Sequence, residues 1–133
     1  MSERLRVGVL GAGHLGRIHI QQIKEVPAFD LVGFHDPHPE KCAAIQAEFG
    51  VGPATSAADL LDRIDVLDIV TPTLSHFALA KEALERGLHV FIEKPVTNTV
   101  AEARELLVLA KMSGRKAQVG HVERFNPAFQ AAA

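Results

Sequence analysis

The chain alternates between short apolar runs and longer amphipathic stretches. The apolar runs predict strands at 5–10, 30–35, 66–70, 88–92 and 116–120, with a weak one at 51–54. Helical patterns predict helices at 14–26, 40–49, 74–87 and 99–113, and another beginning near Ser56. Strands separated by such helices need parallel crossovers. The pattern therefore predicts an α/β fold, a doubly wound parallel sheet of about six strands with helices on both faces.

The first apolar run leads directly into Gly11-Ala12-Gly13-His14-Leu15-Gly16. Gly11 permits the tight turn out of the strand, Gly13 lets phosphates approach the backbone, and Gly16 lets the next helix pack closely. The N–H groups of the first helical turn, including those near His14 and Leu15, then face the anion with the positive end of the helix dipole. This strand, turn and helix predict a Rossmann-type dinucleotide site rather than an ordinary turn.

Other polar residues also follow predicted strands, at the edge where a doubly wound sheet binds its ligands. Asp36 ends the second strand, 20 residues beyond Gly16. A carboxylate there can accept both hydroxyls of the adenosine ribose and would repel a 2′-phosphate. We therefore expect NAD as the cofactor, with NADP less favoured. The alternative is a simple turn aspartate before Pro37.

Composition narrows the functional classes. The 133 residues suggest one domain, and a formal net charge of −2 with no Trp or Tyr argues against a nucleic-acid partner. The apolar runs are too short for a membrane-spanning helix. Cys42 is the only cysteine, which excludes an intramolecular disulfide and fits a reducing cytoplasm. No His or Cys spacing predicts a metal site, and we assign no ligand role to the side chains of His14, His19, His35, His38 and His89.

Together, the glycine-rich turn, the segment Thr71-Pro72-Thr73…His76 and the tripeptide Glu93-Lys94-Pro95 resemble the Gfo/Idh/MocA oxidoreductases. The resemblance covers essentially the whole chain, as the N-terminal NAD(P)-binding domain of that family. It implies that Lys94 lies beside the nicotinamide and hydrogen-bonds the substrate hydroxyl. It also implies that Glu93 lies near the nicotinamide ribose, that the 71–73 segment and His76 lie near the cofactor, and that Lys94–Pro95 is a candidate cis peptide.

The residues themselves support this chemistry. Hydride transfer from a secondary alcohol needs a group that polarises the hydroxyl and shares its proton, and a partly desolvated lysine at a cofactor pocket can do so. For Lys94 the alternative is a solvated loop lysine that forms a surface pair with Glu93. For His76 it is an ordinary polar residue at a helix start.

The last residues, from Gly120 onward, resemble the family segment that leads into a substrate domain. They are similar to a subgroup acting on nucleotide sugars, which includes UDP-N-acetylglucosamine 3-dehydrogenases. The resemblance implies that four residues line the substrate side: His121, Glu123, Arg124 and Asn126. A polar connecting loop is the alternative. We therefore divide the chain into a dinucleotide-binding domain, 1–120, and the start of a connection, 121–133.

Family members continue into an α+β domain that carries a catalytic histidine, and these residues contain none of it. We expect the chain to be part of a longer, homo-oligomeric dehydrogenase acting on a sugar, nucleotide sugar or cyclitol, and to be a poor catalyst alone. Two other classes stay open. A non-catalytic NAD sensor needs the glycine turn and Asp36 but not Lys94, and an assembly domain needs only a vestigial pocket.

Overall fold

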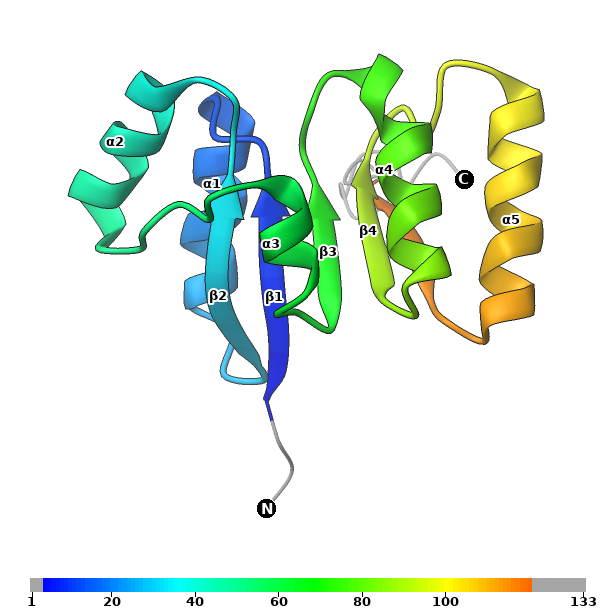
Figure 1. Cartoon of the computed structure of the whole chain (residues 1–133), viewed down its shortest axis with the longest axis horizontal. Helices are drawn as coiled ribbons and strands as arrows, with labels where there is room; N and C mark the ends of the chain where they lie inside the picture. The colour runs from blue at the N-terminus through cyan, green and yellow to red at the C-terminus, as the bar shows by residue number, and fades with distance from the viewer. Residues whose placement is uncertain (1–3, 121–133) are drawn as a thin grey trace, which may run out of the picture.

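The computed structural model describes residues 4–120. Its centre is a five-stranded, all-parallel sheet in the order β2-β1-β3-β4-β5 (Figure 1). The strands are β1 (Leu5–Leu10), β2 (Phe29–His35), β3 (Val66–Ile69), β4 (His89–Glu93) and β5 (Ala117–Gly120). The order runs outward from β1 in both directions, so the strand order reverses beside β1. A doubly wound sheet binds its ligands at this point.

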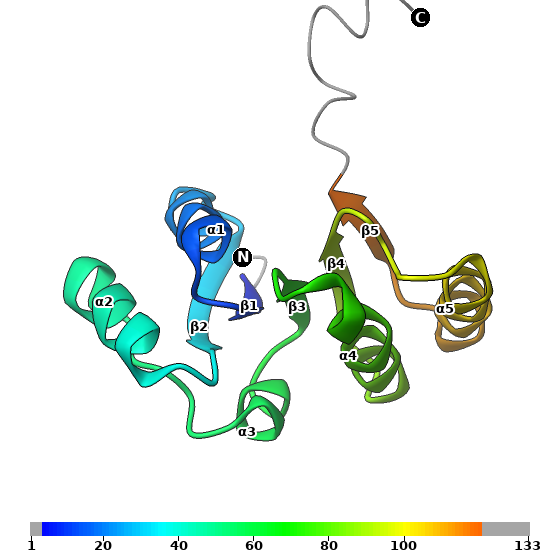
Figure 2. The same ribbon diagram turned by 90° about the horizontal axis from the view of Figure 1, so that it is seen from above.

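Helices cover both faces of the sheet, as predicted. They are α1 (His14–Lys24), α2 (Pro39–Phe49), α3 (Ala57–Leu61), α4 (Thr73–Glu85) and α5 (Val100–Ser113). Figure 2 shows α1 on one face and α3 and α4 on the other, while α5 packs against α4. Within residues 4–120, no helix is both long and apolar enough to cross a membrane.

The helix ends follow local chemistry that the sequence carries. Ser56 accepts a hydrogen bond from the Asp59 N–H and begins α3, as predicted. Thr99 and Glu102 form a reciprocal capping box at the start of α5. Gly114 ends the same helix at a φ of 67°, in the left-handed region that favours glycine.

The weak strand predicted at 51–54 is wrong, and the count of about six strands becomes five. Only a single bridge joins Phe34 and Pro53, with the Ala54 N–H 2.7 Å from the Phe34 carbonyl oxygen. Pro53 has no N–H to donate to a ladder, and the preceding Gly52 weakens an extended segment. One bridge therefore forms where a strand was expected.

Buried side chains fill both sides of the sheet. Beneath α3, α4 and α5 they include Leu60, Leu67, Ile69, Ala80, Ala83, Leu84 and Ile92. Beneath α1 and α2 they are Val9, Ala12, Ile20, Phe34, Cys42 and Ile45. Cys42 is thus a small, buried and largely apolar residue. These two hydrophobic layers pack the helices against the sheet, so the loops at the carboxyl ends of the strands start from fixed positions.

Candidate functional site

The glycine-rich turn between β1 and α1 is built around close backbone approaches. A Cβ on Gly11 would lie 2.4 Å from the Val70 carbonyl oxygen, and Gly11 has a φ of +112°. A Cβ on Gly16 would lie 2.1 Å from the Gly11 carbonyl oxygen. A Cβ on Gly13 would meet nothing within 4 Å. The turn and packing roles predicted for Gly11 and Gly16 are confirmed, and Gly13 presents an open backbone surface.

The start of α1 fits an anionic group. Gly13 is its N-cap and supplies no side-chain acceptor, and the first turn contains no acidic residue. Among residues 4–120 no side chain caps the first-turn N–H groups, which lie at the positive end of the helix dipole. His14 and Leu15 are exposed beside them. With the space beside Gly13, these groups form a cradle that suits the pyrophosphate of a dinucleotide.

Asp36 follows β2 and ties that strand to the turn. Its Oδ2 accepts the Ala12 N–H at 2.8 Å, and its Oδ1 accepts the backbone N–H of His38, also at 2.8 Å. His38 Nδ1 lies 2.8 Å from the same oxygen, and only 8% of the Asp36 side chain is exposed. A carboxylate has about four acceptor positions, so these contacts leave about one free, against the two ribose contacts expected. Sequence reasoning assigned His38 no part in this cluster.

The same contacts change the titration of Asp36. Partial burial alone would raise its pKa, but the hydrogen bonds from Ala12 and His38 and the His38 side chain outweigh burial and lower the pKa of Asp36 below its ordinary value. The ionised form is therefore the one that the fold stabilises. This contribution is present above the unfolded-state pKa and is lost as the pH falls through the lowered folded-state pKa.

Replacing Asp36 by asparagine should lower the free energy of unfolding at pH 7 by about 1–3 kcal/mol, because an amide group turns a donor toward one of the donors that now bind the carboxylate. Urea denaturation of both proteins measures the difference. Below the folded-state pKa the wild-type carboxyl is protonated, so the difference should shrink. A difference that grew on acidification would contradict this account of Asp36.

The loops after β3 and β4 are joined by His76, which is 1% exposed. Its Nε2 lies 2.8 Å from the Thr71 carbonyl oxygen and its Nδ1 lies 2.9 Å from the Pro95 carbonyl oxygen. The Thr71 hydroxyl also accepts a hydrogen bond from Ser75 Oγ at 2.6 Å. His76 therefore holds the backbone of two loops together. Pro72 is exposed on the first of them, and Thr73, the first residue of α4, is half-buried. Its predicted place near the cofactor stays a prediction.

The segment Glu93-Lys94-Pro95 follows β4, and the Lys94–Pro95 peptide is cis, as expected. Glu93 Oε2 accepts the Lys94 N–H at 2.9 Å. The Lys94 side chain is exposed and has no hydrogen-bond or ion-pair partner within residues 4–120. The chain alone does not desolvate Lys94, because the side chain lies beyond the end of β4 and is exposed, so partial desolvation beside a bound cofactor stays a prediction. Its amine is free to meet a ligand.

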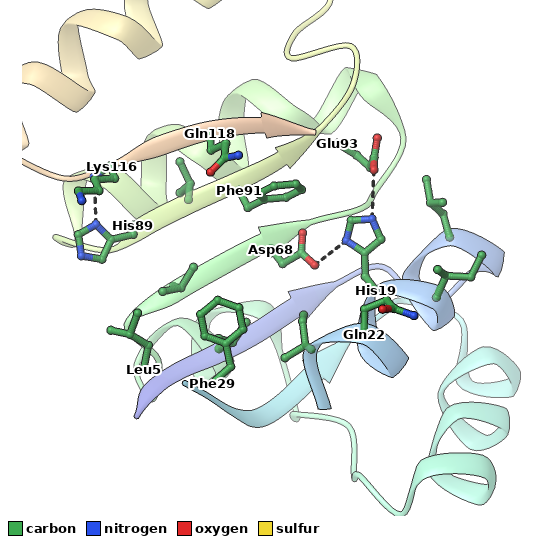
Figure 3. Close-up of a pocket in the computed structure, with 16 residues that line it drawn as sticks. Leu5, His19, Gln22, Phe29, Asp68, His89, Phe91, Glu93, Lys116 and Gln118 are labelled. Atoms are coloured by element: carbon green, nitrogen blue, oxygen red, sulfur yellow. Dashed lines mark hydrogen bonds and ion pairs between the residues drawn. The ribbon is translucent and has the colours of Figure 1, made fainter. Parts of the chain in front are cut away.

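Two residues to which the sequence assigned no role, His19 and Asp68, lie beside Glu93. His19 of α1 lies between Asp68 of β3 and Glu93 of β4, with its Nδ1 2.7 Å from Asp68 Oδ2 and its Nε2 3.1 Å from Glu93 Oε1 (Figure 3). The available signal was Asp68 itself, since a carboxylate within the buried strand at 66–70 is rare unless it is paired.

These three residues close one end of a cavity of about 780 Å³ beside α1. Its walls are mainly apolar side chains of α1 and of β1 to β4, such as Leu5, Phe29 and Phe91, and β5 contributes Gln118 (Figure 3). The cavity runs along the face of the sheet, from Leu15 of the glycine-rich turn to Leu5 and Phe29 at the amino ends of β1 and β2. Its end beside Leu15 and Glu93 reaches the carboxyl edge where the predicted site residues lie.

The structure thus brings the turn, Asp36, the 71–73 loop and the 93–95 segment to one edge of the sheet. The four residues predicted on the substrate side, His121, Glu123, Arg124 and Asn126, lie outside the described residues and stay predictions.

Comparison with known proteins agrees with this geometry. A family model described as an oxidoreductase family with an NAD-binding Rossmann fold, Gfo/Idh/MocA, matches residues 5–121. UDP-N-acetylglucosamine 3-dehydrogenase of Acidithiobacillus ferrooxidans is 39% identical over 95% of this chain and 40% of its own length. A scyllo-inositol 2-dehydrogenase (NAD(+)) of Bacillus subtilis is 33% identical over 97% of this chain and 39% of its own.

Among solved structures, GenD2 from gentamicin A biosynthesis, in complex with NAD, superposes with a TM-score of 0.91 at 28% identity. The match covers 99% of this chain and 38% of that one. The chain therefore spans about two-fifths of the length of the curated relatives it matches. By its sequence, its sheet and its glycine-rich turn, this chain belongs to the Gfo/Idh/MocA oxidoreductases and forms their NAD-binding Rossmann domain.

Proposed function

We propose that the chain is the cofactor-binding part of an NAD-dependent dehydrogenase that acts on a secondary hydroxyl of a sugar, nucleotide sugar or cyclitol. One observation carries the proposal. The open backbone at Gly13 and the amine of Lys94, which has no partner within residues 4–120, both lie at the carboxyl edge of the same parallel sheet. The first fits a pyrophosphate and the second fits the hydroxyl of a substrate.

The residues divide the work between the two ends of the cofactor. The α1 N-terminus binds the pyrophosphate, and the free acceptor position of Asp36 takes a ribose hydroxyl. Glu93 orients the nicotinamide end, and Lys94 hydrogen-bonds the substrate hydroxyl and shares its proton. Bound NAD supplies the hydride acceptor.

The substrate class is supported by the relatives, one named for UDP-N-acetylglucosamine and another for scyllo-inositol. Of these we favour a nucleotide sugar, and we place four residues of the connection on its side: His121, Glu123, Arg124 and Asn126. Residues 1–120 then form the cofactor domain, and 121–133 begin the connection to a substrate domain. We place the homo-oligomeric protein in the cytoplasm, with no nucleic-acid or membrane partner.

Calorimetric titration with NADH and NADPH tests the cofactor half of the proposal. NADPH should bind at least about tenfold more weakly than NADH, because the ionised Asp36 repels a 2′-phosphate. Turnover of UDP-N-acetylglucosamine or scyllo-inositol with NAD by the full-length gene product tests the other half. No binding of millimolar NADH would favour an assembly domain, and binding without turnover of either compound would favour a sensor.

A further inference from the structure

Asp68 is a buried carboxylate that the fold alone does not explain. It lies on β3 between Leu67 and Ile69, and only 6% of its side chain is exposed. Its Oδ2 faces His19, but its Oδ1 has no hydrogen-bond partner among residues 4–120. Burying a half-satisfied carboxylate costs free energy, and an apolar residue would serve the sheet better. This cost points to a role in the site.

His19 connects this carboxylate to the edge of the sheet. Its ring is mostly buried, with 16% of the side chain exposed, and it stands edge-on to Phe91 at 6.0 Å between ring centroids. Both ring nitrogens face carboxylate oxygens, so only the imidazolium donates to both. Burial alone would lower the pKa of His19, but the hydrogen bonds and charges of Asp68 and Glu93 outweigh it and raise that pKa.

Burial raises the pKa of Asp68, and the hydrogen bond and charge of His19 oppose that rise. The 2.7 Å contact between His19 Nδ1 and Asp68 Oδ2 joins the two buried side chains. Among residues 4–120 no group of acidic, His or Cys side chains converges on a point that could hold a metal ion. The side chains of Asp68, His19 and Glu93 instead follow one another in a row, which we call the His19 line (Figure 3).

Glu93 is the end of this line, and both of its oxygens are engaged. Oε1 faces His19 and Oε2 accepts the Lys94 N–H. The side chain also packs against Gly120, where a Cβ would lie 3.2 Å from Oε1. The carboxylate is therefore held in one orientation directly before Lys94. Without His19, the described residues offer Oε1 no other hydrogen-bond partner.

We propose that His19, held by Asp68, is a positioning residue for the nicotinamide end of the site, because it fixes Glu93 and through it the backbone of Lys94. The inference rests on the proposed function. Helix α1 then has two roles. Its first turn faces the pyrophosphate of the cofactor, and His19 on its next turn orients the residues at the nicotinamide end. The binding of the ADP-ribose part of the cofactor should not depend on the His19 line.

Comparing NADH with ADP-ribose, which lacks the nicotinamide, isolates this role. Calorimetry on the full-length gene product measures both dissociation constants. The wild type should bind NADH at least about tenfold more tightly than ADP-ribose, and His19→Asn should reduce that ratio by about tenfold, the loss expected of one charge-assisted hydrogen bond. An asparagine amide can still reach Asp68 but not Glu93. ADP-ribose affinity should stay within about twofold.

His19→Gln is the rescue variant, because its longer side chain can reach Glu93, and it should restore part of the ratio. Asp68→Asn should reduce the ratio less than His19→Asn does, and it keeps the test decisive if His19→Asn does not fold. His89→Asn is the matched control. His89 lies at the opposite end of β4, where its Nδ1 accepts the Lys116 N–H at 3.0 Å, so the ratio should not change.

The outcomes separate the two proposals. A wild type that binds neither compound overturns the proposed function, and the positioning role falls with it. A wild type that binds both, with an unchanged ratio in His19→Asn and Asp68→Asn, overturns the positioning role alone. Equal losses of NADH and ADP-ribose affinity in the His19 variants also overturn it, because a merely structural residue would affect both ligands.

Discussion

Replacing Gly16 by alanine should lower the free energy of unfolding by about 3 kcal/mol or more, as is typical of the worst cases of overpacking. The new Cβ would lie 2.1 Å from the Gly11 carbonyl oxygen and 2.7 Å from its carbonyl carbon. Both are backbone atoms. Gly11 cannot yield easily, because the Val70 carbonyl group is so close that a Cβ built on Gly11 would lie 2.4 Å from its oxygen. Alanine therefore forces α1 away from the turn. Urea denaturation measures the loss.

Gly13→Ala is the matched control, two residues from Gly11 and three from Gly16. A Cβ there meets nothing within 4 Å, and the residue has a φ of −75° that alanine adopts readily. Its stability should fall by about 1 kcal/mol or less, the usual cost of alanine at an N-cap. NADH affinity should nevertheless fall at least about tenfold, because the methyl group occupies the approach of the phosphates. Equal stability of the two variants would contradict the packing argument.

The contrast between these glycines could be predicted from the sequence because it depends on local chain geometry. A strand, a turn and a helix within 6–24 need one glycine for the turn and another for close packing. The cap at Ser56 is local in the same way, because it is set by residues within a few positions of one another. The cis peptide before Pro95 was expected from the family resemblance rather than from local chemistry.

The His19 line could not be predicted in this way, because its residues are far apart in the chain. His19 lies 49 positions from Asp68 and 74 from Glu93. They meet because β3 is placed between β1 and β4, with α1 packed beside them. Only the isolated carboxylate of Asp68 marked the site in the sequence. Its partner was not identifiable until the strand order was known.

Asp36 lies between these two cases. Its place at the end of β2 was predicted correctly, as was its position next to the turn. Its partners were not, because Ala12 lies on the neighbouring connection and His38 folds back onto the carboxylate. The sequence therefore located the group but not the hydrogen bonds that it already makes. Those bonds now limit what a ribose can receive from it.

At residues 51–54 the sequence predicted an element that does not form. Its apolar residues suggested a strand, yet Pro53 allows only one bridge to Phe34. A count of apolar positions overlooks a missing N–H group. The sheet therefore ends at β2, one strand earlier than the hydrophobic pattern indicated.

Replacing Lys94 by methionine should lower kcat of the full-length gene product by about 10²- to 10⁴-fold, the usual contribution of a positioned proton-transfer group. Methionine keeps most of the length of the side chain and removes the amine. Because Lys94 contacts Glu93 through its backbone N–H, the fold and the Glu93 carboxylate should be preserved. NADH affinity should therefore stay within about threefold of the wild type. Steady-state turnover of UDP-N-acetylglucosamine and NADH titration measure the two effects.

Lys81→Met is the control for a lost lysine charge, since Lys81 lies on α4 and pairs weakly with Glu105 at 4.0 Å. It should leave kcat unchanged. This separation of binding from turnover distinguishes a dehydrogenase from a sensor, because a sensor uses the turn and Asp36 but needs no amine at position 94. If Lys94→Met retained full turnover, the hydroxyl proton would have to go to another group, and Lys94 would be a solvated loop lysine after all.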